Sequence, residues 1–369
     1  MNIKNILIVS RAFYPFNSPR ANRATELAKE FARQGHNVKV ITSKEGDVET
    51  FCIQNNIEFK DLGNLTWPTP TIKGSGLILL FWRLIVRFSI LLFEYPMLQL
   101  VFLVKKALKG ENNHDLIISV AVPYPIHWGV ALARKNNHSI AKTWVADCGD
   151  PYMGQENDTF THPFYFGWVE KWFCRKTDFI TVPTKNSYKG YYKKFHPKLK
   201  VIPQGFRFED IEFYKGIKNN DKVIFGYGGV FIKDRRDPTE FINFLNELGE
   251  TYNFEFHIYT KSSQIIMPLL NNTNRIQLKE ILDRKSLLFE MSKMDFVVNF
   301  ENVGIAQTPS KLIDYAIINK PILSVETGGL KTKVILEFLK KDYSNALVID
   351  DKEQYRIENV TKKFLELVK

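Results

Sequence analysis

The chain has 369 residues, enough for about two domains, and is 44% hydrophobic and 25% charged, which excludes a protein that is disordered throughout. Its 51 Lys and Arg residues against 40 Asp and Glu give a net charge of +11, which favours an anionic partner: a nucleotide, nucleic acid or a membrane surface. Cys52, Cys148 and Cys174 are scattered, which argues against a disulfide framework or a structural zinc site and for the reducing cytosol. The first apolar run, residues 6–9, is too short for a secretory signal peptide.

The first half of the chain alternates apolar strands with helical patterns. A strand is predicted at 4–10, a helix at 21–34 that Gly35 ends, and a strand at 37–42. Further strands are predicted at 115–120, 142–147, 178–183 and 200–203. Because helices separate the strands, the pattern predicts a doubly wound parallel sheet of the α/β class.

A polar stretch at 204–221 predicts a link to a second α/β domain. Strands are predicted there at 222–227, 254–259, 275–278, 295–300, 321–325 and 346–349, and helices at 237–250, 286–294, 310–318 and 331–340. The expected domains are residues 1–212 and 213–350, followed by a C-terminal helix within 351–369 that packs back on the first domain. In doubly wound domains, ligands bind beyond the carboxyl ends of the strands.

The segment 308–324, TPSKLIDYAIINKPILS, combines a helix start with charged groups. Ser310 stands near the start of the predicted helix, where unpaired N–H groups favour a phosphate. Lys311 adds a positive charge, and Asp314 lies one turn further on, placed to accept hydrogen bonds from ribose hydroxyls. An ordinary capped helix before a strand fits the same residues.

Five segments together resemble family-four retaining glycosyltransferases of the GT-B fold. PSKLIDYAIINKPIL at 309–323 resembles the donor-nucleotide segment of that family, and VIPQGF at 201–206 its hinge motif. FGYGGVFIKDRRDP at 225–238 resembles the first strand and loop of the nucleotide domain, and residues 6–42 resemble the first βαβ unit. WVADCGDPY at 144–152 resembles a segment of capsule and O-antigen members. The segments span both domains in the order of the family.

The resemblance implies two Rossmann-like domains that face a central cleft, transfer with retention of configuration, and no metal or other cofactor. It places the donor nucleotide sugar against Gly229, Arg235, Arg236, Thr308, Ser310, Lys311, Leu312 and Asp314. Arg235 and Arg236 would supply charge for the diphosphate, because the family's usual arginine is Val230 here, although a solvated turn also explains the pair.

The chain departs from the family at one of two acidic positions eight residues apart. Asp314 stands at the second position, whereas the first is Ala306. Glu301 is the nearest acid upstream and cannot reach the same place without rearrangement of the loop. The departure puts the donor sugar in doubt more than the class of donor.

The candidate catalytic residues are Asp150, His127 and Asp147, which follow or end predicted strands of the first domain. A carboxylate at such an edge takes the proton from an acceptor hydroxyl or only orients it, and Asp150 is alternatively a turn residue before proline. His127 is expected near the sugar or acceptor, with a histidine on a helix surface as the alternative. The acceptor side is assigned to Arg20, Asn22 and Arg23 of the first strand–helix loop, which otherwise decorate a helix start.

Two segments predict contact with an anionic membrane surface. Residues 74–110 are densely apolar and basic but interrupted by Glu94 and Pro96, which favours helices at the membrane interface over a spanning helix; a buried helix pair is the alternative. In 185–195, lysines recur every four residues beside aromatic side chains, which is typical of a headgroup-binding or a solvated helix face. No recognition module accompanies it, which argues against nucleic acid.

The sequence therefore predicts a cytoplasmic glycosyltransferase, peripheral on the inner face of the cell membrane. It would move a sugar from a nucleoside diphosphate sugar to an acceptor hydroxyl, on a lipid-linked glycan of bacterial surface polysaccharide synthesis. Two alternatives stay open: a nucleotide-sugar epimerase of the same fold, and a non-catalytic membrane-bound component of a polysaccharide assembly complex.

Overall fold

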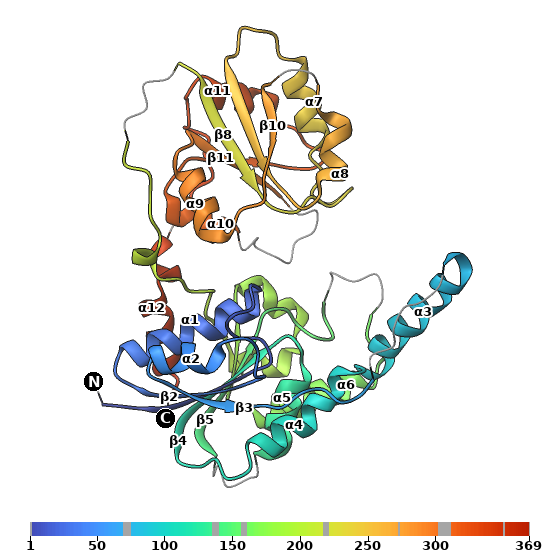
Figure 1. Cartoon of the computed structure of the whole chain (residues 1–369), viewed down its shortest axis with the longest axis vertical. Coiled ribbons are helices and arrows are strands. Elements are labelled where there is room, and N and C mark those ends of the chain that lie inside the picture. Colours follow the sequence, from blue (N-terminus) through green and yellow to red (C-terminus); the bar gives the residue numbers. More distant parts are fainter. Residues whose placement is uncertain are drawn as a thin grey trace. The chain divides into compact units, whose positions relative to one another are not determined.

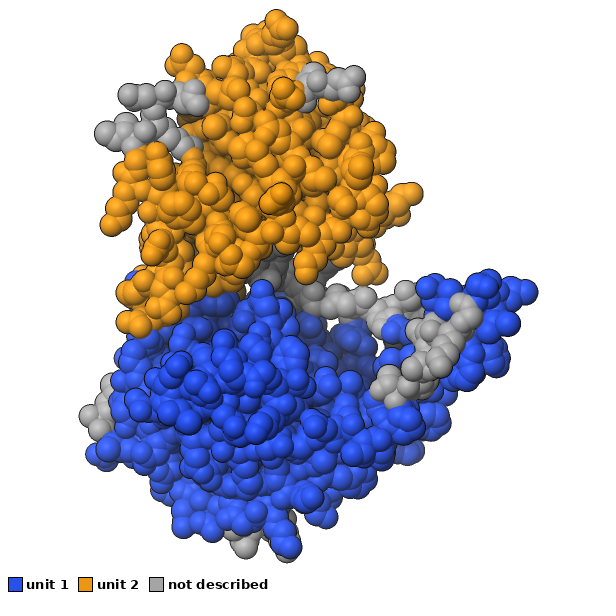
Figure 2. Space-filling view, viewed as in Figure 1, with its two compact units in different colours: residues 1–206, 355–369 blue, residues 207–354 orange. Residues whose placement is uncertain are grey.

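The computed structural model describes residues 2–68, 75–134, 140–155, 161–216, 221–271, 274–301, 311–349 and 351–368. The chain divides into two compact units: residues 1–206 with 355–369, called unit 1, and residues 207–354, called unit 2 (Figure 2). The division falls after residue 206, not after 212, and the last fifteen residues belong to unit 1. Both units are α/β, which confirms the predicted class.

Unit 1 is built on a seven-stranded parallel sheet with the order β3-β2-β1-β4-β5-β6-β7. Its strands are β1 (Asn5–Ser10), β2 (Asn37–Thr42), β3 (Ile57–Asp61), β4 (His114–Ala121), β5 (Ala141–Cys148), β6 (Phe179–Val182) and β7 (Leu199–Val201). The strand β3 was not predicted, because only Ile57 and Phe59 are apolar in it. The carboxyl ends of β1, β4 and β5 lie side by side and carry the candidate acceptor-side residues.

Helices cover both faces of this sheet (Figure 1). They are α1 (Pro19–Arg33), α2 (Val48–Gln54), α4 (Leu100–Ala107), α5 (Pro125–Ala133), α6 (Phe166–Lys176) and α12 (Ile357–Leu365). The helix α3 (Gly76–Phe93) does not pack on the sheet. Alternate residues of β1 serve the two faces: Ile8 packs in one core with Phe364 of α12, and Leu7 packs in the other with Phe173 of α6. A strand buried on both faces must be apolar throughout, which accounts for the run ILIV.

The helix α1 begins at a local capping motif. The Ser18 hydroxyl accepts a hydrogen bond from the N–H of Ala21 at 3.2 Å, and Pro19 occupies the first helical position. Gly35, at φ +82°, ends the element in a conformation that a side chain would strain. Because the cap sits just after the β1 loop, Arg20, Asn22 and Arg23 fall in the first two turns, above the sheet edge.

Unit 2 carries a five-stranded parallel sheet with the order β10-β9-β8-β11-β12. Its elements are β8 (Val223–Gly228), α7 (Thr239–Glu247), β9 (Phe254–Tyr259), α8 (Ser263–Ile266), β10 (Ile276–Lys279), α9 (Arg284–Ser292), β11 (Phe296–Phe300), α10 (Lys311–Ile318), β12 (Ile322–Val325) and α11 (Thr332–Leu339). The strand predicted at 346–349 is wrong: Leu347 donates one hydrogen bond to Ile322, but these residues form no strand.

The apolar segment splits into two helices of opposite character. The helix α4 buries Leu100, Val101 and Val104 in the core of unit 1, whereas α3 has no buried residue and projects from that unit (Figure 1). Glu94, at φ +51°, ends α3 before Pro96. Among the described residues, the stretch 76–107 is long and apolar enough to cross a membrane by length and composition only.

The basic segment after β6 does not form the predicted α-helix. It folds into two short 3-10 helices, Lys185–Gly190 and Lys193–Lys198, separated at Tyr191. Tyr191 and Phe195 are buried, so the lysines that recur in the sequence do not share one helix face. Three residues per turn, instead of 3.6, shift every side chain from its expected direction.

Candidate functional site

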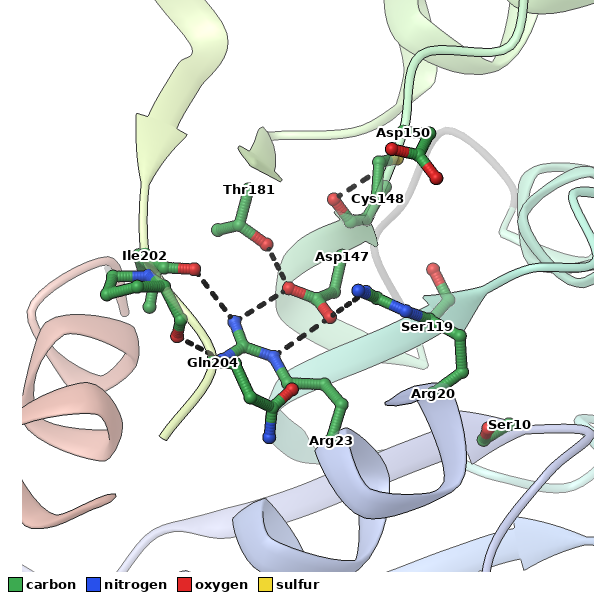
Figure 3. A network of polar contacts seen from close by, with 12 residues as sticks. Ser10, Arg20, Arg23, Ser119, Asp147, Cys148, Asp150, Thr181, Ile202 and Gln204 are labelled. Carbon is green, nitrogen blue, oxygen red and sulfur yellow. Dashed lines mark hydrogen bonds and ion pairs between the residues drawn. The ribbon is translucent and has the colours of Figure 1, made fainter. Parts of the chain in front are cut away.

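A buried ion pair lies at the carboxyl end of β5 (Figure 3). Arg23 of α1 donates to both carboxylate oxygens of Asp147, from Nε at 3.1 Å and from Nη2 at 2.9 Å. The hydroxyl of Thr181 on β6 donates to the same carboxylate at 2.7 Å, and Nη1 of Arg20 lies 3.7 Å from it. Sequence reasoning missed Thr181, because nothing in FITV marks a polar partner inside a strand.

Arg23 also joins the chain segment that follows β7. Its guanidinium donates to the carbonyl oxygens of Ile202 at 3.1 Å and Pro203 at 2.5 Å and lies over the ring of Phe364. Its side chain is 3% exposed. The expectation that Arg23 meets an acceptor is therefore wrong: it lies on the sheet-facing side of α1 and fastens α1, β5 and residues 202–203 together.

Asp147 is poorly suited to the proton transfer predicted for it. Burial acts to raise the pKa of its carboxyl group, but the charges of Arg23 and Arg20 and the Thr181 hydrogen bond outweigh burial and hold that pKa below its usual value. The side chain is 4% exposed. A buried carboxylate that keeps its charge this firmly is a weak base, so the geometry gives Asp147 a positioning role in place of a catalytic one.

His127 is buried and does not reach the surface of unit 1. Its Nδ1 lies 2.7 Å from the Ser119 hydroxyl and its Nε2 3.3 Å from Cys148 Sγ, and its ring stacks on Phe173. Burial lowers the pKa of the imidazole to about 3, so it is neutral. The expectation of a cleft-facing histidine is wrong, because α5 starts at Pro125 and turns residue 127 back onto the sheet.

Arg20, Asn22 and Asp150 are the candidates of unit 1 that reach solvent. The guanidinium of Arg20, in a side chain that is 25% exposed, packs against Gly149, where an added Cβ would stand 2.6 Å from Arg20 Cζ. Asp150 follows directly, and its carbonyl oxygen accepts a hydrogen bond from the Tyr124 hydroxyl. Gly149 therefore lets a cation and a carboxylate-bearing loop approach each other at the sheet edge.

A pocket of about 240 Å³ opens beside the N-terminus of α1, and sequence reasoning did not find it. It is lined by Arg11, Ala12, Phe16, Asn17, Ser18, Ser43 and Glu45. Its residues come from the loops after β1 and β2, so it stands at the same sheet edge as Arg20. Loop residues 11–18, RAFYPFNS, mix aromatic and polar types without a motif, which is why only the fold brings the pocket residues together.

In unit 2, the loop after β8 presents the predicted basic pair. Gly229 donates to the Tyr259 carbonyl at 2.8 Å, which continues the sheet into the loop. Arg235 is exposed, whereas Arg236 is half-buried and donates from Nη1 to the Val230 carbonyl at 3.1 Å. The backbone N–H groups of both arginines bond to Ile232, so the pair stands on a tight turn at the carboxyl edge of the sheet.

The helix α10 starts at Lys311 and carries Leu312 and Asp314 in its first turn. Thr308 and Ser310 lie outside the described residues, as does the side chain of Lys311. Asp314 accepts hydrogen bonds from Arg284 of α9, from Nε at 3.0 Å and Nη2 at 2.5 Å. Sequence reasoning missed Arg284, thirty residues upstream.

Glu301 follows β11 at the same edge and is oriented by a relay of side chains. Its Oε1 accepts from the Ser324 hydroxyl on β12 at 2.6 Å, and the Ser324 oxygen accepts from Asn299 at 3.1 Å. Glu301, the acid nearest to the family's first acidic position, is thus held in place by β12. Among the described residues, no three His, Cys, Asp or Glu side chains stand close enough together to hold a metal ion.

Comparisons with known proteins agree on the family and the fold. The model of Glycosyltransferase Family 4 matches residues 21–209, which is more than half of the chain. The chain therefore belongs to this family and is a glycosyltransferase. No curated protein sequence matches.

Solved structures share the whole fold at low sequence identity. A glycosyltransferase from Rickettsia africae superposes with a TM-score of 0.65 at 12% identity, covering 99% of this chain and 98% of that one. The Anabaena protein HepE in complex with UDP and glucose gives 0.61 at 14% identity, with 98% of each chain covered. The lipopolysaccharide outer core galactosyltransferase WaaB gives 0.60 at 10% identity, again over 98% of each chain. The fold is thus that of GT-B glycosyltransferases.

Proposed function

We propose that this glycosyltransferase moves a sugar from a nucleoside diphosphate sugar to an acceptor hydroxyl with retention of configuration. The observation that carries the proposal is the carboxyl edge of the unit 2 sheet. The turn with Arg235 and Arg236, the start of α10 at Lys311 and the Asp314 carboxylate held by Arg284 all lie there. This edge is where open α/β sheets bind nucleotides. The presence of UDP and glucose in the similar Anabaena structure supports the same class of donor.

The donor is proposed to lie against Gly229, Arg235, Arg236, Thr308, Ser310, Lys311, Leu312 and Asp314. A helix N-terminus and nearby cations stabilise a departing diphosphate as it gains charge, without need of a metal or other cofactor. In this proposal Asp314 accepts hydrogen bonds from the ribose hydroxyls. Its ion pair with Arg284 holds the carboxylate in place before the nucleotide binds.

The acceptor is proposed to bind to unit 1 beside Arg20, Asn22 and Asp150. Asp150 is the partly exposed carboxylate of the three catalytic candidates, so it is the one that can meet an acceptor hydroxyl and take or orient its proton. Asp147 acts through Arg20, whose charge it holds close to the Asp150 loop.

The acceptor class is proposed to be a lipid-linked glycan of bacterial surface polysaccharide synthesis. The exposed apolar helix α3 supports work at an anionic membrane surface, with the protein peripheral on its cytoplasmic face. The similarity of WaaB to this chain supports a bacterial surface glycan as the product.

A donor-binding screen tests the donor half of this proposal. Calorimetry with a panel of nucleoside diphosphates and their sugars should show one base bound preferentially, and Asp314→Asn should weaken the nucleoside diphosphate far more than inorganic diphosphate. Equal losses on both ligands would remove Asp314 from the ribose site. The three candidate functions differ in their reaction products. A transferase releases nucleotide at a useful rate only when acceptor is present, and an epimerase alters the sugar without acceptor. A non-catalytic component does neither.

A further inference from the structure

The helix α3 exposes apolar side chains in nearly every direction. None of its 18 residues is buried, and the side chain of Leu77 is 84% exposed. Successive residues of a helix point about 100° apart, so Leu77, Ile78 and Leu80 face three different sides. Its two basic residues, Arg83 and Arg87, stand four residues apart and share one narrow stripe.

A second exposed apolar patch lies at the start of α6. Phe164 is 75% exposed and Trp168 is 64% exposed, and their rings meet edge to face at 5.5 Å. A spacing of four residues places Trp172 on the same side, and Lys176 and the exposed Arg175 follow it. Aromatic rings followed by basic groups are the residue types that gather at the level of lipid headgroups. We call Phe164, Trp168 and Trp172 the aromatic stripe.

Two hydrogen bonds place this stripe beside the base of α3. The hydroxyl of Tyr165, the residue just before α6, donates to the Leu92 carbonyl in the last turn of α3. The hydroxyl of Tyr152 donates to Glu94 Oε1 at 2.7 Å, where α3 ends. The aromatic stripe and α3 are therefore neighbours in unit 1, joined where α3 ends.

We propose that α3 and the aromatic stripe insert together into an anionic bilayer. The α3 side chains lie among the acyl chains, Arg83 and Arg87 reach up to phosphate groups, and the stripe lies at headgroup level. This inference rests on the proposed function only in taking the acceptor to be lipid-linked.

The shape of the surface favours a bilayer over a protein partner. A protein groove covers one side of a helix, whereas exposed apolar groups surround α3 on all sides but the Arg83–Arg87 stripe, and hydrocarbon can cover them all. Two arginines near the middle of the helix disfavour an upright span, although 18 residues reach about 27 Å. A helix that lies along the bilayer below the headgroups, with its cationic stripe turned toward them, satisfies both the apolar and the basic side chains.

The surface is joined directly to the acceptor side of unit 1. Tyr152 stands two residues after Asp150, is 3% exposed, and packs against Tyr124, whose hydroxyl bonds to the Asp150 carbonyl. Because Glu94 holds Tyr152 at the base of α3, insertion of α3 brings the Asp150 loop to the membrane surface. The acceptor class that this geometry fits is an amphiphile whose glycan extends from the bilayer.

Vesicle partitioning of the full chain tests this surface. The probes are vesicles of phosphatidylcholine with and without phosphatidylglycerol, and the readout is the fraction bound after flotation. The double variant Phe164→Ser/Trp168→Ser should lose affinity for anionic vesicles by about tenfold or more, because two large side chains no longer leave water. The control Ile53→Ser/Met267→Ser removes two equally exposed apolar side chains elsewhere and should bind like the wild type.

A second readout identifies what covers the surface. Lipids brominated along the acyl chains should quench Trp82 of α3 in a variant whose other tryptophans are phenylalanine. Failure of the wild type to float, binding of the stripe variant at wild-type strength, or Trp82 buried by a second copy or another protein would each overturn the inference. Nucleoside diphosphate affinity of the wild type is measured in parallel. A wild type that binds vesicles but no nucleoside diphosphate contradicts the donor proposal. A wild type that binds nucleoside diphosphate but no vesicles contradicts only the membrane surface.

Discussion

The carboxylate of Asp147 has little contact with water and keeps its charge through Arg23. Compared with an apolar pair of the same size, a buried ion pair of this kind adds little net stability. Removal of one partner, however, leaves a buried charge without compensation. The pair also ties α1 to β5 and to residues 202–203, so its removal should be felt across unit 1.

Replacement of Arg23 by Met should lower the free energy of unfolding of unit 1 by about 3–5 kcal/mol, because Asp147 is then left buried without its main partner. Urea unfolding followed by circular dichroism measures the change. Arg175→Met, at an exposed position of α6, is the control and should change stability by less than about 0.5 kcal/mol. Equal stability of the two variants would mean that the pair is not formed in solution.

The same pair predicts a dependence of stability on acid pH. The pKa of Asp147 is held below its unfolded value of about 3.9, so the folded state binds fewer protons there. The stabilisation is complete above the unfolded pKa and is lost as the pH falls through the folded pKa. The stability gap between wild type and Asp147→Asn should therefore narrow below about pH 4, and a gap that stays constant to pH 2 would contradict the assignment.

Asp150 is expected to act on the acceptor side alone. Asp150→Asn should depress turnover by about 10²–10⁴-fold if the carboxylate serves as a base, and should leave nucleoside diphosphate affinity unchanged. Initial-rate kinetics and calorimetry on the same preparation separate the two effects. A collapse of donor affinity in Asp150→Asn would move this residue to the donor half of the site.

At the residue scale, sequence reasoning found the positions but not always their roles. Asp147 and His127 were selected because they end or follow strands, and Arg23 because it was assigned to the first strand–helix loop. The structure places Asp147 at the end of β5, His127 in α5 and Arg23 in α1. Whether such a residue faces solvent or the core depends on the rotation of α1 and α5 against the sheet, which residues far away in the chain determine. Thr181 and Arg284 could not be found, because their partners are contributed by other elements.

Among the elements, α10 combines the two parts of the donor proposal. It starts at Lys311, and Asp314 follows one turn later, already paired with Arg284. The sequence predicted this helix because TPSKLIDY joins a helix-starting proline and serine to an apolar face, which is a local pattern. The contact with α9 is not local, so the partner of Asp314 stayed outside the prediction.

Lys311→Ala should weaken nucleoside diphosphate binding by about 1–3 kcal/mol, the range of a hydrogen bond to a charged group. Calorimetry gives the change, and thermal unfolding confirms that the variant is folded. Lys333→Ala, on an exposed face of α11, removes a lysine with the same loss of net charge and should leave the affinity unchanged. An affinity that falls equally in both variants would indicate long-range charge, not a contact.

The segment 74–110 shows where composition stops being informative. Its apolar content is similar before and after Glu94, yet α4 is core and α3 is exposed. Composition records how apolar a helix is, whereas burial depends on whether the rest of the fold supplies a face for it. The sequence therefore supported both an interfacial and a buried helix; α4 is buried in the structure, whereas α3 is exposed.

For the whole molecule, alternation of strands and helices was enough to predict two α/β units, because each βαβ unit is a local pattern with a fixed hand. The order of the strands and the return of α12 to unit 1 are set by packing between distant segments: Val360 and Phe364 fill the core beside α1 and Gly205. The similar glycosyltransferase structure from Rickettsia africae shares this fold over 99% of the chain.

The central claim is that the chain transfers a sugar from a nucleoside diphosphate sugar to an acceptor, and nucleotide release measured with and without acceptor tests it most directly. The full chain is incubated with a panel of sugar nucleotides in vesicles that carry lipid-linked glycans. We expect one donor to release nucleoside diphosphate in step with a glycan product longer by one sugar, with its anomeric configuration retained, and the rate to fall in Asp150→Asn. Folded wild-type protein that releases no nucleotide from any donor, or that converts the donor sugar equally well without acceptor, would contradict the account.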